Sequence, residues 1–342
     1  MRHAHCCGPL AIRLTELWHD DAPGERRAAL VEHGNIVEVY IQRDMHWVLG
    51  EGGEGRIDRK TPSGAYVVAD DGSELLLRSK ISDPDGTLVA FEVVREAISE
   101  PGRIKLPEVK LRDTVSGDLD QKADLWARRI ALLGQKSLTA PIAEGFDIAL
   151  AGQSRIGDVT ISFQRTKAGL VFDVDGIGDA FVINGIAATE VARLLRLYQI
   201  GAMVMVDFVA MESKAQRTEI AEIFDAAAAS DGRPFERTAI NGFGMMQVVR
   251  ARPRPSVLDH LFGTRIAALS DETQAHWLLR AVAQSSGFGV RTVSARPDVV
   301  TLLNSQLWAS LRAQAVRLAG ADMVVVADEK TAGYGHVHVA QS

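Results

Sequence analysis

The chain has few of the residues that mark secreted or membrane-embedded proteins. Of its 342 residues only two are cysteines, Cys6 and Cys7, and these are adjacent. Neighbouring cysteines rarely bridge each other, so we expect no disulfide framework. With His3 and His5 they form a metal-capable cluster, for which a frayed terminus is the alternative, and their role stays open. No apolar run approaches about 18 residues and no signal peptide is recognisable, so we expect no membrane span and a cytoplasmic location.

Charge of either sign is also not in large excess. The formal net charge of −6 argues against a general nucleic-acid binder held by overall charge. Basic clusters such as Arg26–Arg27 are candidates for local contacts, with a solvated face as the alternative. A hydrophobic content of 46% and a charged content of 24% are typical of a globular protein. This length accommodates two or three domains.

Short strands separated by turns dominate the first part of the chain. Residues 1–48 predict a β-rich N-terminal part of the main body, and residues 49–112 predict a small S1/OB-type β-barrel. The strands expected in the barrel are 65–68, 74–77 and 89–94. We expect Gly50–Gly55 to be a glycine-rich loop, although it matches neither a P-loop nor a dinucleotide-binding fingerprint. Residues 113–157 are expected to form a connector.

Strand and helix patterns alternate in residues 158–262. Two short apolar strands, Leu170–Gly176 and Met203–Val209, flank an amphipathic helix, and a further strand is expected at Thr238–Ile240. This alternation predicts an α/β core with a mostly parallel sheet.

The last residues, 263–342, predict a small C-terminal α/β domain. It is expected to contain one helix from Pro297 to about Ala319, a strand at Met323–Val326 and an edge strand at His336–Val339. The predicted fold class is therefore α/β, in the sense of an α+β multidomain protein: a small barrel, an α/β core and a small terminal domain.

The two apolar strands of the core each carry carboxylates. Asp173 and Asp175 share one face of their strand, and a helical crossover between parallel strands would bring Asp207 close to them. Burying a carboxylate costs several kcal/mol unless it is paired or binds a metal. Carboxylate oxygens suit Mg²⁺, or Mn²⁺ in its place. The alternative is that the aspartates cap helices or pair with Arg193 or Arg250.

Four stretches of the core share the order and spacing of one family pattern. They are Phe172–Asp175, Ile186–Leu197, Ile200–Val209 and Gly242–Arg252. The pattern runs I-D-x-N, A-x-x-x-A-R-x-x-R-L-R, G-G-x-x-x-x-D-F-I-D-M and F-G-L-x-x-x-x-R-x-R. On these residues the chain resembles the catalytic core of the ribonuclease E/G family over roughly residues 158–255. Weaker similarity extends to the barrel, which is similar to the family's S1-type RNA-binding barrel, and to the C-terminal domain.

The resemblance implies a Mg²⁺-dependent endoribonuclease that hydrolyses phosphodiester bonds of single-stranded RNA, in RNA processing (rRNA included) or decay. Asp173 and Asp207 match the family's two metal-binding aspartates, and water activated by the metal would attack the phosphorus. Asp175 stands where the family has asparagine and is expected to support or share the metal. Ala210 replaces a further family aspartate.

The resemblance also implies residues that contact RNA. Arg250 and Arg252 match the family's R-x-R, and together with Arg193 they are expected to contact the phosphate backbone. In the barrel region we expect contacts from Lys105 and from Tyr66. Tyr66 would stack on a base, with core packing as the alternative.

Two departures from the family pattern limit the prediction. No cysteine lies beyond Cys7, so the zinc-linking C-P-x-C motif is absent; we expect no structural zinc, and any oligomer would not be zinc-linked. Residues 113–157 are too few for most of the 5′-monophosphate sensor region of full-length relatives, which implies a compact member. The alternative function is an RNA-binding family member with little or no catalytic turnover, which Ala210 and the acidic balance favour.

Overall fold

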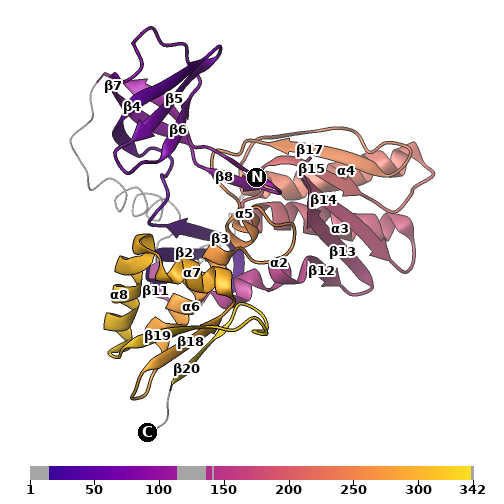
Figure 1. Ribbon diagram of the computed structural model, residues 1–342. Helices are drawn as coiled ribbons and strands as arrows, with labels where there is room; N and C mark the ends of the chain where they lie inside the picture. Colours follow the sequence, from indigo (N-terminus) through magenta and orange to yellow (C-terminus); the bar gives the residue numbers. More distant parts are fainter. Residues whose placement is uncertain (1–14, 114–135, 141, 340–342) are drawn as a thin grey trace, which may run out of the picture.

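The computed structural model describes residues 15–113, 136–140 and 142–339. Its strands form a four-stranded sheet, a closed barrel, a six-stranded sheet, a three-stranded sheet and a two-stranded ribbon (Figure 1). The predicted α+β multidomain class is therefore confirmed. The Cys6–Cys7 pair and most of the predicted connector lie outside the described residues. Within the described ranges, no helix has the length and apolar character needed to cross a bilayer.

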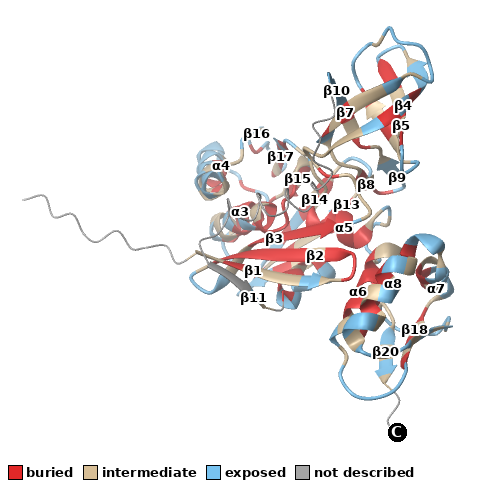
Figure 2. Ribbon diagram, turned by 90° about the vertical axis from the view of Figure 1, so that its left-hand side faces the viewer, coloured by how far each residue is buried: buried red, intermediate tan, exposed pale blue. Residues whose placement is uncertain are grey.

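The N-terminal sheet has the strand order β11-β1-β2-β3. Its strands are β1 (Thr15–Ala22), β2 (Glu25–Glu32), β3 (Asn35–Arg43) and β11 (Lys136–Thr139). A hairpin turn at Pro23–Gly24 joins β1 to β2, and Gly24 adopts a φ of +72°, which glycine accommodates without strain. Strands β2 and β3 are largely buried at the centre of the molecule (Figure 2). This sheet contacts both the core and the C-terminal module.

The closed barrel has the strand order β10-β6-β5-β4-β7. Its strands are β4 (Gly52–Thr61), β5 (Gly64–Ala69), β6 (Glu74–Leu77), β7 (Leu88–Arg95) and β10 (Glu108–Arg112). The predicted loop at Gly50–Gly55 is wrong from Gly52 onward, because β4 already begins there. A Cβ on Gly53 would lie 2.8 Å from the rings of both Phe91 and Trp47. Glycine in this strand therefore makes room for aromatic side chains in a narrow barrel.

A short ribbon ties the barrel to the core. It consists of β8 (Ile98–Glu100) and β9 (Arg103–Lys105), and Gly102 between them donates from its backbone N–H to the carbonyl of Thr264 at 2.9 Å. At the start of the ribbon, the Glu96 N–H donates to the Pro253 carbonyl at 2.9 Å. These hydrogen bonds satisfy backbone groups that the barrel itself leaves unpaired.

The core sheet has the order β12-β13-β14-β15-β17-β16. Its strands are β12 (Gln153–Ile156), β13 (Val159–Arg165), β14 (Leu170–Gly176), β15 (Ala202–Asp207), β16 (Phe235–Arg237) and β17 (Met245–Arg250). The prediction of a mostly parallel sheet is wrong, because only β14 and β15 run parallel. The helix α3 (Ala180–Leu197) makes the single crossover, and the other neighbours pair antiparallel. The strand expected at Thr238–Ile240 lies at β16 instead, where Phe235 packs edge-on against Phe224.

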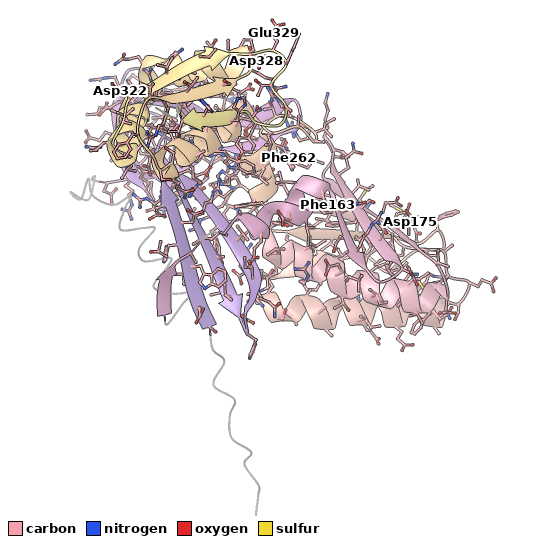
Figure 3. All side chains as sticks on the ribbon, turned by 90° about the horizontal axis from the view of Figure 1, so that it is seen from below. Phe163, Asp175, Phe262, Asp322, Asp328 and Glu329 are labelled. Carbon is pink, nitrogen blue, oxygen red and sulfur yellow. The ribbon has the colours of Figure 1, made fainter. Side chains whose placement is uncertain are left out.

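Helices cover one face of this sheet only. The helices α3 and α4 (Lys214–Ala228) pack on each other and share a continuous apolar core with the inward residues of the strands. Preceding β12 is the short helix α2 (Asp147–Ala151). Figure 3 shows the two long helices along one side of the sheet and labels Asp175 on the other. The outward face of the sheet is therefore free to present polar side chains.

The C-terminal module has the sheet order β19-β18-β20. It contains α6 (Asp271–Gln284), β18 (Arg291–Ala295), α7 (Pro297–Asn304), α8 (Ala309–Ala319), β19 (Met323–Ala327) and β20 (His336–Val339), and it follows α5 (Val257–Phe262). The single helix predicted from Pro297 to about Ala319 is wrong, because extended backbone at Ser305 (ψ 153°) separates α7 from α8. This break lets Trp308 turn into the core, where it is 1% exposed and packs against the ring of His276.

A buried charge network joins this module to the N-terminal sheet. Arg43 on β3 forms salt bridges with Glu25 on β2 at 3.0 Å and with Glu272 on α6 at 3.1 Å. Burial opposes ionisation of Glu25, but Arg27 and Arg43 outweigh it and lower the pKa of that carboxyl well below its usual range. The module is thus attached through charges that are satisfied only while the two parts remain packed.

Two buried histidines at this junction predict loss of stability in acid. Burial, aided by the charge of Arg43, lowers the pKa of His260 to about 3 and that of His276 to about 4. Since an unfolded histidine titrates near 6.5, both contribute stability that is complete above that pH and falls as pH drops toward 4. We expect the free energy of unfolding in urea to fall by about 1 kcal/mol per pH unit for each histidine. A urea midpoint that does not change between pH 7 and pH 5 would contradict this expectation. The control is His336→Gln, a substitution at an exposed histidine, which should leave this pH dependence unchanged.

Candidate metal-binding site

Alternation along β14 places its two aspartates outside the core. Phe172 and Val174 are buried against the helices, whereas Asp173 and Asp175 point to the opposite face and are exposed. On β15, Asp207 likewise alternates with buried Val206 and is half-buried. The carboxylates are therefore not embedded among Val and Phe, as the apolar sequence of the strands suggested, but form part of the open face of the sheet.

The one parallel pair of strands brings two of these aspartates together. Asp173 on β14 and Asp207 on β15 are direct partners in the register of the ladder. Neighbouring strands lie about 4.8 Å apart, so carboxylates at paired positions on one face can bind one ion. Asp175 lies one step further along the same face of β14. The strand register therefore agrees with the prediction that Asp207 lies close to the other two aspartates.

Asp173, Asp175 and Asp207 together form a cluster of negative charge. Partial burial, together with the charges of Asp175 and Asp207, raises the pKa of Asp173. Within the described residues, no arginine or lysine forms a salt bridge with any of the three. Each arginine named in the alternative has another partner: Arg193 pairs with Glu190 at 2.6 Å, and Arg250 pairs with Asp231. The alternative pairing is therefore wrong, and the helix cap of α3 comes from Asp179.

The donor set fits one kind of cation better than others. Across the described ranges, no group of three or more His, Cys, Asp or Glu side chains is arranged to hold a metal. Within those ranges the three aspartates therefore do not form a group of protein ligands of the kind that Ca²⁺ or structural Zn²⁺ uses. Mg²⁺ instead keeps several waters and binds through one or two carboxylates plus phosphate oxygens of a substrate. The paired Asp173 and Asp207 offer that set, with Asp175 beside them.

Sequence reasoning missed other polar side chains on the same face. Ser162 on β13 is the register partner of Asp173, and Thr160 is the partner of Asp175. The sequence did contain a pattern that indicates a polar strand face: Thr160, Ser162 and Gln164 alternate with the buried Val159 and Ile161. Without knowing that β13 pairs antiparallel with β14, this alternation could not be related to the aspartates.

Two of the predicted RNA-contacting arginines lie away from the carboxylates. Arg250 on β17 alternates with exposed Val249, so it points to the inward face, where it is 6% exposed. Arg193 lies on α3, which packs on the helical side of the sheet. Both arginines are separated from Asp173 by the sheet itself.

Arg252 and Lys105 come together at a different place. Arg252 bridges Glu100 of the ribbon at 3.2 Å and Asp259 of α5 at 2.8 Å, and Lys105 pairs with the same Glu100 at 2.6 Å. They line a cavity of about 260 Å³ that also contacts the first residues of β14 and β15. This cationic cavity lies at the ends of those strands that are remote from Asp207.

Tyr66 lies on the surface of the barrel. It is half-buried on β5, and the guanidinium of Arg59 stacks on its ring at 3.8 Å from the centroid. Core packing, the alternative for this residue, is therefore wrong; the barrel core is instead formed by residues such as Phe91, which is 1% exposed. An aromatic ring with a cation stacked on it is a typical element of a single-strand binding surface.

The fold and the site together define a multidomain α+β protein in which a closed OB-like barrel is joined to a sheet that presents paired carboxylates. Residues 161–253 match the family model described as "Ribonuclease E/G family", which confirms the predicted resemblance for this segment. The chain is 34% identical over 77 residues to "Ribonuclease E" of Nostoc sp., covering 22% of this chain and 11% of that protein. It is 32% identical over 109 residues to "Ribonuclease E/G-like protein, chloroplastic" of Arabidopsis thaliana, covering 29% of this chain and 11% of that protein.

Proposed function

We propose that this chain is a Mg²⁺-dependent endoribonuclease that cleaves single-stranded RNA in RNA processing or decay. The observation that supports this most strongly is the register of Asp173 and Asp207 on the open face of the sheet. Both lie inside the segment that matches the Ribonuclease E/G family, and the relatives reported above are named Ribonuclease E and Ribonuclease E/G-like protein.

In this proposal Asp173 and Asp207 hold the cation, and Asp175 orients the water around it. Burial and, after it, the charges of Asp175 and Asp207 raise the pKa of Asp173, so a cation bound there would reduce the repulsion among the three carboxylates. A bound Mg²⁺ supplies Lewis-acid stabilisation of the phosphodiester and activates water for attack. The hydroxyl of Ser162, the register partner of Asp173, would hydrogen-bond the phosphate or a water molecule.

Single-stranded RNA is the substrate that suits the remaining surfaces. A closed OB-like barrel that carries the half-buried ring of Tyr66 on its surface, beside Arg59, favours contact with unpaired bases. Lys105 and Arg252 line the cationic cavity and would contact backbone phosphates in competition with Glu100 and Asp259, with which they pair. Arg193 and Arg250 would support the fold of the core, because both are paired on the far side of the sheet.

The proposal is tested with matched RNAs of one sequence. An unstructured strand should be cut in Mg²⁺ and not in EDTA, whereas its perfect duplex should be cut at least tenfold more slowly. If the sensor region is reduced as predicted, 5′-phosphorylated and 5′-hydroxyl forms should be cut at similar rates. Cleavage that persists in EDTA, or that prefers the duplex, would contradict the proposal.

An RNA-binding role without turnover is the second candidate. It is favoured by Ala210, which replaces a family carboxylate, and by the lack of a three-ligand group among the described residues. In that case the unstructured strand would bind without yielding fragments in Mg²⁺ or Mn²⁺. The same experiment therefore separates the two candidates.

A further inference from the structure

Phe243 is a large aromatic side chain held almost entirely in solvent. It is 86% exposed, and it lies in the turn before β17 between Gly242 and Gly244. A single exposed apolar residue is common, so its exposure alone implies nothing. Two features distinguish Phe243 from other exposed apolar residues: the turn that holds its backbone, and its position near the carboxylates.

The turn that carries Phe243 is fixed by hydrogen bonds. The side-chain oxygen of Asn241 accepts from the backbone N–H of Phe243 at 2.9 Å and of Met245 at 3.1 Å. Gly244 has a φ of +89°, and a Cβ there would lie 2.4 Å from the carbonyl oxygen of Phe208. The turn therefore closes onto the end of β15, and the aromatic side chain extends from an ordered backbone.

This turn lies beside the carboxylates. Met245 is the register partner of Asp207, and Phe243 lies two residues before Met245 in the chain, in the turn that leads into β17. Ile177, also 86% exposed, follows Asp175 by two residues at the same edge of the sheet. Exposed apolar side chains thus stand on both sides of the edge at which the carboxylates lie.

The surroundings of Phe243 favour a small flat ligand over a protein partner. A stable protein interface buries about 800 Å² on each side with an apolar centre. Phe243 is instead flanked in the chain by two glycines and Asn241, and it lies in the turn that leads to the register partner of Asp207. A nucleobase needs only one exposed aromatic face, and the glycines leave that face open.

We propose that Phe243 stacks on the nucleobase next to the scissile phosphate, with Ile177 in contact with the neighbouring nucleotide. This rests on the proposed function and adds a substrate-binding residue to it. Stacking on a fixed turn holds the nucleotide so that its phosphate lies over Asp173 and Asp207.

The chain contains a matched control for the test. Phe288 also lies between two glycines, is 90% exposed and belongs to the C-terminal module, on a loop remote in sequence from the carboxylates. The test compares the RNA affinities of Phe243→Ala and Phe288→Ala. They are measured by fluorescence anisotropy of a short labelled uridine-rich RNA in EDTA, where cleavage is suppressed. Phe243→Ala should weaken binding about 5- to 100-fold, and Phe288→Ala should leave it unchanged. Phe243→Trp should restore binding, and its fluorescence should be quenched when RNA is added.

A set of RNAs that each lack one base locates the stacked nucleotide. One abasic position should weaken wild-type binding as much as Phe243→Ala does and should cause no further loss in that variant. Phe243→Ala binding as tightly as wild type, with normal thermal melting, would overturn the stacking proposal alone. If the wild-type chain neither binds RNA in this assay nor cleaves it in Mg²⁺, the proposed function falls with the stacking proposal, and the two failures are thereby distinguished.

Discussion

Replacing Asp207 with asparagine should lower Mg²⁺-dependent cleavage of an unstructured RNA by about 1000-fold. Asparagine keeps the size of the side chain and one oxygen ligand but removes the charge that, paired with Asp173, attracts the cation. Stabilisation of the transition state by a bound metal is worth several kcal/mol, and about 4 kcal/mol corresponds to this factor. Initial rates at saturating RNA, measured over a Mg²⁺ titration, give the effect on both turnover and metal affinity.

The same substitution should not weaken the fold. The charge of Asp207 helps to raise the pKa of Asp173, so its removal relieves repulsion and should leave the melting temperature unchanged or slightly higher at pH 7. Asp158→Asn is the control, because Asp158 is an exposed carboxylate in the turn before β13 of the same sheet. Cleavage by Asp207→Asn within a few-fold of that by Asp158→Asn would mean that Asp207 binds no catalytic metal.

Replacing Arg43 with methionine should destabilise the protein by about 3–5 kcal/mol. Arg43 is 2% exposed and is the shared partner of Glu25 and Glu272. Its loss leaves Glu25 with Arg27 at 2.8 Å and Arg280 at 3.6 Å, leaves Glu272 with His46, and removes the side chain that bridges the two parts through both carboxylates. Its guanidinium also donates to the hydroxyl of Thr273 at 2.8 Å, so α6 loses a second contact. Urea unfolding followed by far-ultraviolet circular dichroism and by tryptophan fluorescence measures the loss.

The control for Arg43 lies on the neighbouring strand. Arg26 on β2 pairs with Asp44 at 3.8 Å on the surface, with side chains 29% and 43% exposed. Arg26→Met should change the free energy of unfolding by less than about 1 kcal/mol, because exposed ion pairs contribute little. Equal effects of the two substitutions would show that the junction between the N-terminal sheet and α6 does not depend on the buried charges.

The sequence predicted the site best where the signal was local. Alternation along Leu170–Gly176 placed Asp173 and Asp175 on one face, and the helical crossover placed the strand of Asp207 beside them. The barrel was also predictable, because its short strands and turns follow one another along the chain. These features depend on neighbours in sequence, which periodicity reports directly.

The sequence did not predict the features that depend on pairing between strands far apart in the chain. That β13 and β17 run antiparallel to their neighbours depends on long-range contacts, so the partners Ser162 and Met245 could not be assigned. Arg250 matched a motif, yet its position in the strand turns it inward. The break between the helices at Ser305 allows Trp308 to be buried, but no glycine or proline marks this break in the sequence.

The most direct test of the central claim is diffraction from crystals soaked in Mn²⁺, recorded for its anomalous signal. Mn²⁺ takes oxygen ligands as Mg²⁺ does and can be located without ambiguity. If Asp173 and Asp207 share one cation, a strong peak should lie within about 2–2.5 Å of a carboxylate oxygen of each. A peak elsewhere, with none between these two side chains at millimolar Mn²⁺, would contradict it.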